Sequence, residues 1–304
     1  MTTDQLERAR GLAMPDRDAM LRRDPDVQRF WLDNRETFER AWQEWEAAAD
    51  IAPPDESLLD PALRSAVTAA WQDPSTESTV RDLLEEAAPN VYSFQCFDPE
   101  RLADFRSYLE ALWDAGIPLR PPYGILLNRG GAMLDARSEG YLAAPSFQRF
   151  YETLVTTYMR PISRLLFPDI VGFDTQTFGF SINYKPTTET SIRPHTDASS
   201  VTLNININMP GEEFTGSTVD FYDRASDQVS SLRFEPGTAM IHRGDVPHTA
   251  QPITSGERTN LVLWLFGDRG QVPWSALGAQ PASPTTPAER WSTPATPADG
   301  SAPF

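Results

Sequence analysis

The sequence predicts an α+β chain in which helices precede a mainly β core of the jelly-roll or barrel type. In the first half of the chain, apolar residues recur with helical periodicity between short polar turns. After about residue 170, the sequence changes to short β-branched and aromatic runs that Gly, Pro, Asp and Asn separate. Many short strands at this spacing are typical of jelly rolls and barrels. The length of 304 residues fits one such domain with added helices.

Residues 1–90 are predicted to form a helical region that packs on the core. Asp24-Pro25 supplies an N-cap and a proline at the first helical position, and this helix is expected to continue to about residue 50. Its aromatic residues follow at steps of seven, four and three, namely Trp31, Phe38, Trp42 and Trp45. These steps keep them on one helix face, which we expect to pack on the core rather than to bind a partner. Further helices are expected over residues 61–71 and 78–87.

Residues 91–277 are predicted to form the core domain. A strand is expected at 91–94, an amphipathic helix at 99–113, and a long helix at 146–166 that Pro168 ends. The strands that follow are predicted at 178–184, 200–208, 217–222, 228–234, 238–242 and 260–266.

Residues 278–304 form a segment of a different kind, in which Pro, Ala, Ser and Thr dominate. Such a composition does not supply enough apolar side chains for a core. We therefore expect an extended or mobile tail.

The overall charge and composition exclude several classes of function. A net charge of -17, from 43 acidic and 26 basic residues, disfavours nucleic-acid binding, which needs a basic surface. We expect neither a membrane span nor a secretory signal, because no run of 18 apolar residues occurs and no basic segment with an apolar core opens the chain. The single cysteine, Cys96, excludes an internal disulfide and fits a reducing compartment, or one in which disulfides are not used, and a cytoplasmic location is expected.

Three histidines are present, and their spacing predicts a metal site. His195 and Asp197 lie two residues apart, so on an extended segment both side chains point the same way. A third ligand has to come from elsewhere, and His248 is preferred over His242, which we expect to be a neighbour of the site or structural. Two imidazoles and one carboxylate match the facial triad of non-haem Fe(II) sites. The alternative is an ordinary strand histidine, His195, paired with Asp197.

Arg258 lies ten residues after His248, at the start of the last predicted strand. A planar guanidinium binds a carboxylate with two hydrogen bonds, so it suits the far end of a dicarboxylate that chelates a metal. Thr202, Asn204 and Asn206 alternate along one strand and share a face. We expect this face to line a cofactor cavity, and the alternative is a polar side that faces solvent.

At these residues the sequence resembles the Fe(II)/2-oxoglutarate-dependent dioxygenases, and within them the prolyl and lysyl hydroxylase branch. The resemblance covers residues 91 to 270 approximately. It lies in Tyr184, in residues 195–204 and 214–217, and in the run from Pro236 through His242, His248 and Arg258 to Trp264.

The resemblance implies a double-stranded β-helix, a cupin-like jelly roll, with the N-terminal helices as an elaboration. It implies that His195, Asp197 and His248 bind Fe(II), that Arg258 binds 2-oxoglutarate, and that O2 is the other co-substrate. Ascorbate is a further candidate as reductant. Tyr184 could donate its phenolic hydrogen to 2-oxoglutarate, although a barrel aromatic residue is an equal alternative.

Two positions bear on how closely the chain follows this pattern. Gly216-Ser217 replaces the usual Gly-Gly, which we expect to affect the loop more than the chemistry. Asp197 is retained, and this disfavours halogenation, for which relatives have a small residue at that position.

The implied reaction is hydroxylation of an unactivated C–H bond with release of succinate and CO2. The substrate is expected to be an amino acid, a peptide or protein residue, or a specialised small molecule, and the oligomeric state is left open. Desaturation, cyclisation or epimerisation by the same oxidant is one alternative. A non-catalytic, cupin-like metal-binding sensor or scaffold is the other.

Overall fold

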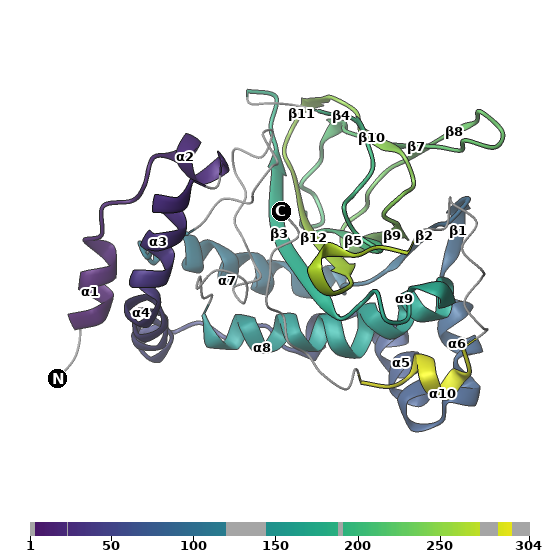
Figure 1. The fold of residues 1–304 in the computed structure, drawn as a ribbon, viewed down its shortest axis with the longest axis horizontal. Helices are drawn as coiled ribbons and strands as arrows, with labels where there is room; N and C mark the ends of the chain where they lie inside the picture. The colour runs from purple at the N-terminus through teal and green to yellow at the C-terminus, as the bar shows by residue number, and fades with distance from the viewer. Residues whose placement is uncertain (1–3, 23, 120–143, 188–190, 274–284, 294–304) are drawn as a thin grey trace.

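The computed structural model describes residues 4–22, 24–119, 144–187, 191–273 and 285–293, in which two antiparallel sheets face each other (Figure 1). The larger sheet has six strands, every neighbouring pair of which is antiparallel. Across the sheet they are β1 (Glu85–Ala88), β2 (Val91–Gln95), β9 (Thr238–Arg243), β5 (Val201–Asn206), β12 (Arg258–Phe266) and β3 (Gln176–Tyr184).

The smaller sheet covers one face of the larger sheet. Its strands are, in order, β4 (Ile192–His195), β10 (His248–Ala250), β7 (Val219–Tyr222) and β8 (Val229–Leu232). A separate pair, β6 (Thr215–Gly216) and β11 (Ile253–Ser255), leads into this layer. Two facing antiparallel sheets confirm the predicted double-stranded β-helix core.

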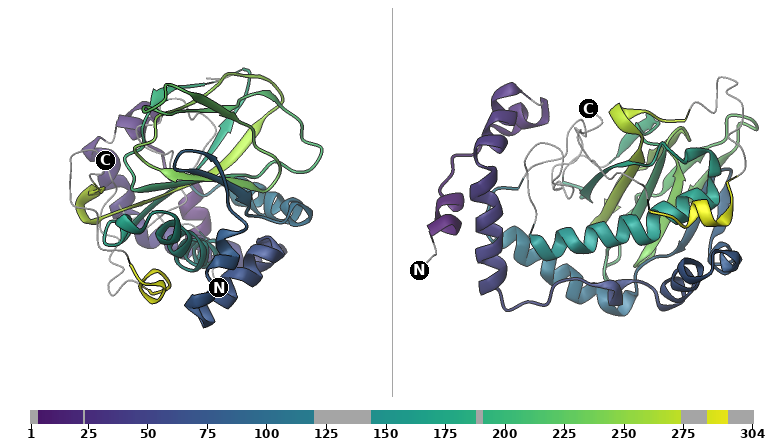
Figure 2. Two further views of the ribbon diagram at one scale, coloured as in Figure 1. Left: turned by 90° about the vertical axis from the view of Figure 1, so that its right-hand side faces the viewer. Right: turned by 60° about the horizontal axis from the view of Figure 1, so that its bottom comes forward.

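Helices cover the other face of the larger sheet, as Figure 2 shows from two directions. They are α7 (Leu102–Asp114), α8 (Pro145–Thr153) and α9 (Arg160–Leu166). A π-helical segment, η4 (Leu154–Met159), joins α8 to α9, so the long helix predicted at 146–166 is confirmed with one irregular turn. Because both of its faces are covered, β12 is buried along its whole length.

The N-terminal helices lie at one end of this layer (Figure 1). They are α1 (Asp4–Arg10), α2 (Arg17–Arg22), α3 (Pro25–Asp33) and α4 (Arg35–Ala48), whereas α5 (Pro61–Gln72) and α6 (Ser78–Arg81) lie at the opposite end, near α9. The chain also contains short 3-10 turns, namely η1 (Glu56–Leu58), η2 (Pro74–Thr76), η3 (Pro99–Arg101), η5 (Pro168–Ile170) and η6 (Asp268–Gly270).

The aromatic face predicted for this region is buried. Trp31, Phe38, Trp42 and Trp45 are 0%, 1%, 1% and 8% exposed, and the ring centroid of Trp45 lies 6.2 Å from that of Tyr108 on α7. Aromatic pairs at such distances add to the stabilisation that burial of their area provides.

Two N-terminal predictions were wrong in part. The helix expected up to residue 50 breaks at Asn34, whose side-chain amide donates to the carbonyl oxygen of Phe30 and competes with helical bonding. The helix expected at 78–87 ends at Arg81, and residues 85–88 instead form β1, which pairs with β2. The division at residue 90 therefore falls inside a hairpin, and the domain boundaries remain a prediction.

The expectation of an extended or mobile tail is wrong for residues 285–293. Here α10 (Pro287–Arg290) has a capping box between Thr286 and Glu289, and Trp291 is 5% exposed. The Trp291 ring packs on Trp71 at 5.8 Å between centroids. Arg290 also forms an ion pair with Glu77, and Arg164 donates to the carbonyl oxygens of Glu289 and Ser292, so a buried indole and these polar contacts together dock a segment whose composition is otherwise that of a linker. Residues 278–284 and 294–304 lie outside the described residues.

No helix in the described part of the chain is long and apolar enough to cross a membrane.

Candidate active site

The structure brings His195, Asp197 and His248 together between the two sheets. His195 ends β4 and His248 begins β10, and the two residues are direct partners in the antiparallel register. Asp197 follows β4 by two residues, and one ligand atom from each of the three side chains lies within 4.8 Å of the others. The Nε2 atoms of His195 and His248 are 3.5 Å and 3.8 Å from Oδ1 of Asp197. Their assignment as metal ligands remains a prediction.

The backbone around the two histidines fits metal binding. Nδ1 of His195 lies 2.8 Å from the carbonyl oxygen of Arg193, and Nδ1 of His248 lies 3.0 Å from that of Val246. Because a carbonyl oxygen accepts only, each Nδ1 has to carry the hydrogen in these contacts. In the neutral form of each ring, Nε2 then has a lone pair on the side of Asp197, which is the arrangement that metal-binding histidines adopt. The donor set therefore fits a divalent iron.

Asp197 is held from two sides. Thr202 donates its hydroxyl hydrogen to Oδ2 of Asp197 at 2.6 Å, and the backbone N–H of Asp197 donates to the carbonyl oxygen of Gly244 at 2.8 Å. A Cβ atom on Gly244 would lie 1.9 Å from the carbonyl oxygen of Ser199, so a residue with a side chain does not fit there. This close approach of two loops determines where the carboxylate lies.

The protonation states of Asp197 and His248 favour a metal cation. Burial by itself raises the pKa of Asp197, but the hydrogen bond with His195, the nearby His248 and His242, and the bond from Thr202 hold that pKa well below its ordinary value. Burial lowers the pKa of His248 despite the opposing effect of Asp197. Burial by itself lowers the pKa of His195, but the hydrogen bond and the charge of Asp197 hold that pKa above its ordinary value. An ionised carboxylate and neutral imidazoles are the forms that bind metals, so a metal ion at this site would compete with a proton on His195.

His242 lies beside the triad and outside it, as the sequence suggested. Its Nε2 is 3.9 Å from Oδ2 of Asp197, and its ring centroid is 4.8 Å from that of His248. Nδ1 contacts the carbonyl oxygen of Arg243 at 2.8 Å. Burial, reinforced by His248, lowers the pKa of His242 to about 4, so the ring is neutral.

Arg258 begins β12 in the larger sheet, directly opposite Tyr184 on β3, and is 1% exposed. Its guanidinium stacks 4.2 Å from the ring centroid of Tyr184 and 5.3 Å from that of Phe234. Nη1 donates to the carbonyl oxygen of Ser217, whereas Nε is buried without a hydrogen-bond partner. Among the described residues, no carboxylate forms an ion pair with this guanidinium. A buried cation with a free donor fits a carboxylate ligand, which would restore the lost hydration.

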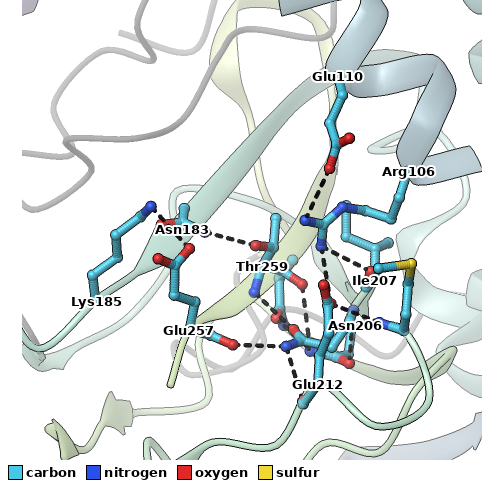
Figure 3. A network of polar contacts seen from close by, with 12 residues as sticks. Arg106, Glu110, Asn183, Lys185, Asn206, Ile207, Glu212, Glu257 and Thr259 are labelled. Carbon is cyan, nitrogen blue, oxygen red and sulfur yellow. Dashed lines mark hydrogen bonds and ion pairs between the residues drawn. The ribbon is translucent and has the colours of Figure 1, made fainter. Parts of the chain in front are cut away.

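The three polar residues of β5 have different surroundings. Thr202 contacts Asp197, and Asn204 accepts a hydrogen bond from Asn260 at 2.6 Å. Asn206 is fully buried in an amide network (Figure 3). Its Nδ2 lies 3.0 Å from Oδ1 of Asn208 and 3.1 Å from Oδ1 of Asn260, and its Oδ1 accepts from the backbone N–H of Asn208. These contacts use both ends of the Asn206 amide, so we limit the cofactor-lining proposal to Thr202 and Asn204.

One side of the triad is open to solvent. The His195 side chain is 32% exposed, compared with 7% for Asp197 and 11% for His248. Of the three side chains, that of His195 is therefore the most accessible.

The structure adds residues that sequence reasoning missed. The ring of Phe221 on β7 packs 5.6 Å from His248 and 5.2 Å from His242, between centroids. Phe234 and Ser217 contact Arg258, and Gly244 contacts the segment that carries Asp197. One of these residues had a signal in the sequence: Val219 and Phe221 alternate with polar or less buried positions on β7, which indicates that the Phe221 ring faces inward.

No protein-family model matches this chain, but comparison with curated proteins gives relatives, among them two whose names include 2-oxoglutarate and iron. The chain is 25% identical over 267 residues to the 2-oxoglutarate and iron-dependent oxygenase domain-containing protein ICU11 of Arabidopsis thaliana, over 82% of this chain and 62% of that protein. It is 32% identical over 215 residues to the 2-oxoglutarate and iron-dependent oxygenase domain-containing protein 2 of Xenopus tropicalis, over 66% of this chain and 56% of that protein. The third relative is the multifunctional procollagen lysine hydroxylase and glycosyltransferase LH3 of Rattus norvegicus, at 30% identity over 61% of this chain and 24% of that protein. The chain thus spans less than two thirds of the length of these relatives.

Two solved structures that align with this chain are prolyl 4-hydroxylases. One is from Pseudomonas putida, with 14% identity, a TM-score of 0.42, and coverage of 67% of this chain and 98% of that chain. The other is from Phytophthora capsici, with 13% identity, a TM-score of 0.47, and coverage of 73% and 70%. The assignment of the fold rests on the two facing sheets of this chain.

Proposed function

Because this chain is a homologue of the 2-oxoglutarate and iron-dependent oxygenases, we propose that it is an Fe(II)- and 2-oxoglutarate-dependent dioxygenase that hydroxylates an unactivated C–H bond and releases succinate and CO2. Its two-sheet core would carry this activity. The names of the relatives and the His-Asp-His triad both support dependence on iron and 2-oxoglutarate.

The single observation that carries the proposal is the environment of Arg258. A metal triad alone is compatible with many functions, including a cupin-like sensor that performs no chemistry. A buried guanidinium that stacks on Tyr184, with Nε free and no carboxylate of the described chain beside it, has no evident use in such a sensor. It suits the distal carboxylate of a ligand whose other end reaches the triad.

Each part of the site would then have a distinct task. The iron would be held by His195, Asp197 and His248. When bound, it would supply the activation of O2 that is coupled to the oxidation of 2-oxoglutarate. Thr202 keeps the Asp197 carboxylate in one orientation, and the backbone carbonyls at Arg193 and Val246 keep the two imidazoles in one tautomer. Burial of Asp197, His242 and His248 excludes water from the inner side, so a substrate C–H bond is presented from the His195 side.

For the substrate, we propose an amino-acid side chain, either free or within a peptide or protein, with a specialised metabolite as the other candidate. The relative that is named a procollagen lysine hydroxylase supports the first class. The partial exposure of His195 also supports it, because a side chain that projects from a peptide can reach a site with one open side.

The test is an assay for succinate formation from 2-oxoglutarate with added Fe(II), with amino acids and short peptides as substrates. We expect succinate in amounts equal to a product that has gained one oxygen atom. A product that has instead lost two hydrogens would indicate desaturation or cyclisation, and an inverted stereocentre would indicate epimerisation. A protein that binds neither iron nor 2-oxoglutarate would refute the proposal.

A further inference from the structure

Ser217 combines two features that are each unfavourable in a folded protein. Its φ angle is +53°, in the left-handed region that side chains disfavour. The residue is also 1% exposed, and its hydroxyl is buried without a hydrogen-bond partner. The other left-handed residues in the described ranges, glycines apart, are Asn90 and Asp227, which are exposed and of types that tolerate this conformation.

A glycine at position 217 would remove both penalties. It adopts a positive φ without steric cost and has no hydroxyl to leave unpaired. The residue before it shows what this turn demands, because a Cβ atom on Gly216 would lie 2.3 Å from the carbonyl oxygen of Pro252. At position 217 the chain nevertheless carries a side chain whose only polar group has no partner in the described protein.

The position of Ser217 suggests what that partner is. Its carbonyl oxygen accepts a hydrogen bond from Nη1 of Arg258. Two residues in direct contact therefore each present a buried donor without a partner, Oγ of Ser217 and Nε of Arg258. Ser217 leads directly into β7, whose Val219 and Phe221 are buried in the cluster between the sheets, so it lies at the edge of the same interior.

We propose that the Ser217 hydroxyl donates a hydrogen bond to the distal carboxylate of 2-oxoglutarate, beside the guanidinium of Arg258. This inference rests on the proposed function. A carboxylate has lone pairs for donors from both residues, and bonds of this type to an ionised acceptor are stronger than neutral ones. The strained turn then holds the hydroxyl in place before the ligand arrives, as backbone outliers at functional sites commonly do.

The experiment compares two ligands on the Mn(II)-loaded, full-length protein by calorimetric titration. 2-Oxoglutarate carries the distal carboxylate, and 2-oxobutyrate has the same 2-oxo acid end without it. Ser217→Ala should weaken 2-oxoglutarate binding by about tenfold, the equivalent of about 1.4 kcal/mol. The affinity for 2-oxobutyrate should not change. Ser217→Gly relieves the left-handed strain as well, so it guards against a folding defect and should show the same selective loss.

Ser163→Ala is the matched control. Ser163 on α9 is 0% exposed, and its hydroxyl likewise lacks a partner, but it does not contact Arg258. This variant should bind both ligands as the wild type does. The inference is overturned if both Ser217 variants bind 2-oxoglutarate with wild-type affinity, or if they lose affinity equally for the two ligands. A wild-type protein that does not bind 2-oxoglutarate at all refutes the proposed function as well, and so the two failures are distinct.

Discussion

His195 and His248 stand directly opposite each other across the β4–β10 pair, with their ring centroids 4.3 Å apart. These strands have four and three residues, so very little regular structure determines the position of two proposed metal ligands. Asp197 and the residues that hold it therefore contribute much of the precision of the site. The first two predictions examine that contribution.

Asp197→Ala should abolish tight metal binding, because two neutral imidazoles remain where a charged ligand completed the set. The loss should exceed the roughly 10- to 100-fold that removal of a supporting group typically causes. Calorimetric titration with Mn(II) measures it. Asp114→Ala, an exposed acid at the end of α7, serves as the control and should bind as the wild type does. Equal affinity of the wild type and Asp197→Ala would show that the metal lies elsewhere.

Thr202→Val should weaken metal binding by about tenfold while the fold is retained, because it removes the hydroxyl that orients Asp197. Thr249→Val is the matched control, since the Thr249 hydroxyl is also buried but has no hydrogen-bond partner. The same Mn(II) titration applies. The proposed role of Thr202 is wrong if both valine variants lose affinity to the same extent.

Arg258→Ala should keep metal affinity and lose 2-oxoglutarate affinity. Removal of a buried, charge-assisted pair is expected to cost about 3 kcal/mol, or roughly 150-fold in the dissociation constant. Arg258→Met preserves most of the side-chain volume and shows whether an altered core contributes to the loss. Titration of each Mn(II)-loaded variant with 2-oxoglutarate provides the measurement, with the exposed Arg233→Ala as control. Parallel loss of metal and 2-oxoglutarate binding would contradict the separate roles.

Cys96 predicts a dependence of stability on pH. Burial, with a smaller effect of Asp60, raises the pKa of the Cys96 thiol above its ordinary value of 9.0. The unfolded chain therefore ionises at a pH at which the folded protein does not. The contribution of this group to the free energy of unfolding is complete below pH 9.0 and falls as pH rises above it, approaching about 1.4 kcal/mol per pH unit.

Urea unfolding at several pH values between about 8 and 10 measures this effect. The wild type should lose stability more steeply with pH than Cys96→Ala, in which the other groups titrate unchanged. At pH 8, the folded wild type should also resist a thiol reagent that labels the unfolded chain. Parallel pH profiles of the two proteins would contradict the prediction.

Trp291→Ala should destabilise the protein without affecting the site. The indole packs on Trp71, and its N–H donates to Glu77, so its removal should cost about 3 to 5 kcal/mol in the free energy of unfolding. The exposed Thr293→Ala is the control. Urea unfolding measures the loss, and Mn(II) titration should show unchanged affinity. An unchanged free energy of unfolding would mean that residues 285–293 do not dock in solution.

Much of the core could be predicted from local patterns. β3 and β12 have nine residues each, and aromatic and aliphatic side chains occupy much of both strands, so these segments could be predicted as buried strands. The His195 and Asp197 pair was also predictable, because side chains two residues apart share a side of an extended segment. His248 was preferred over His242 because His242 ends a predicted strand, on the other side of the tight turn at 243–247, and the resemblance to known dioxygenases agreed with this choice.

The remaining features depend on contacts between distant parts of the chain. β4 contains Pro194 and has only four residues, and it is a strand because His248 pairs with it from 53 positions further along. Docking of Trp291 requires Trp71 and Glu77, and a local composition rich in proline gave no sign of it. The left-handed conformation of Ser217 lies where β6 meets β11, and the serine in place of the usual second glycine gave no sign that the positive φ is kept.

Two of the proposed metal ligands and the arginine proposed to bind the carboxylate belong to different layers. His195 and His248 lie on strands of the smaller sheet, whereas Tyr184 and Arg258 lie on strands of the larger one. A ligand that contacts both the metal and Arg258 has to span the gap between the sheets, so the distance between the sheets selects the length of the ligand. A diacid one carbon shorter or longer would bind less well for this reason alone, without a further residue that contacts its chain.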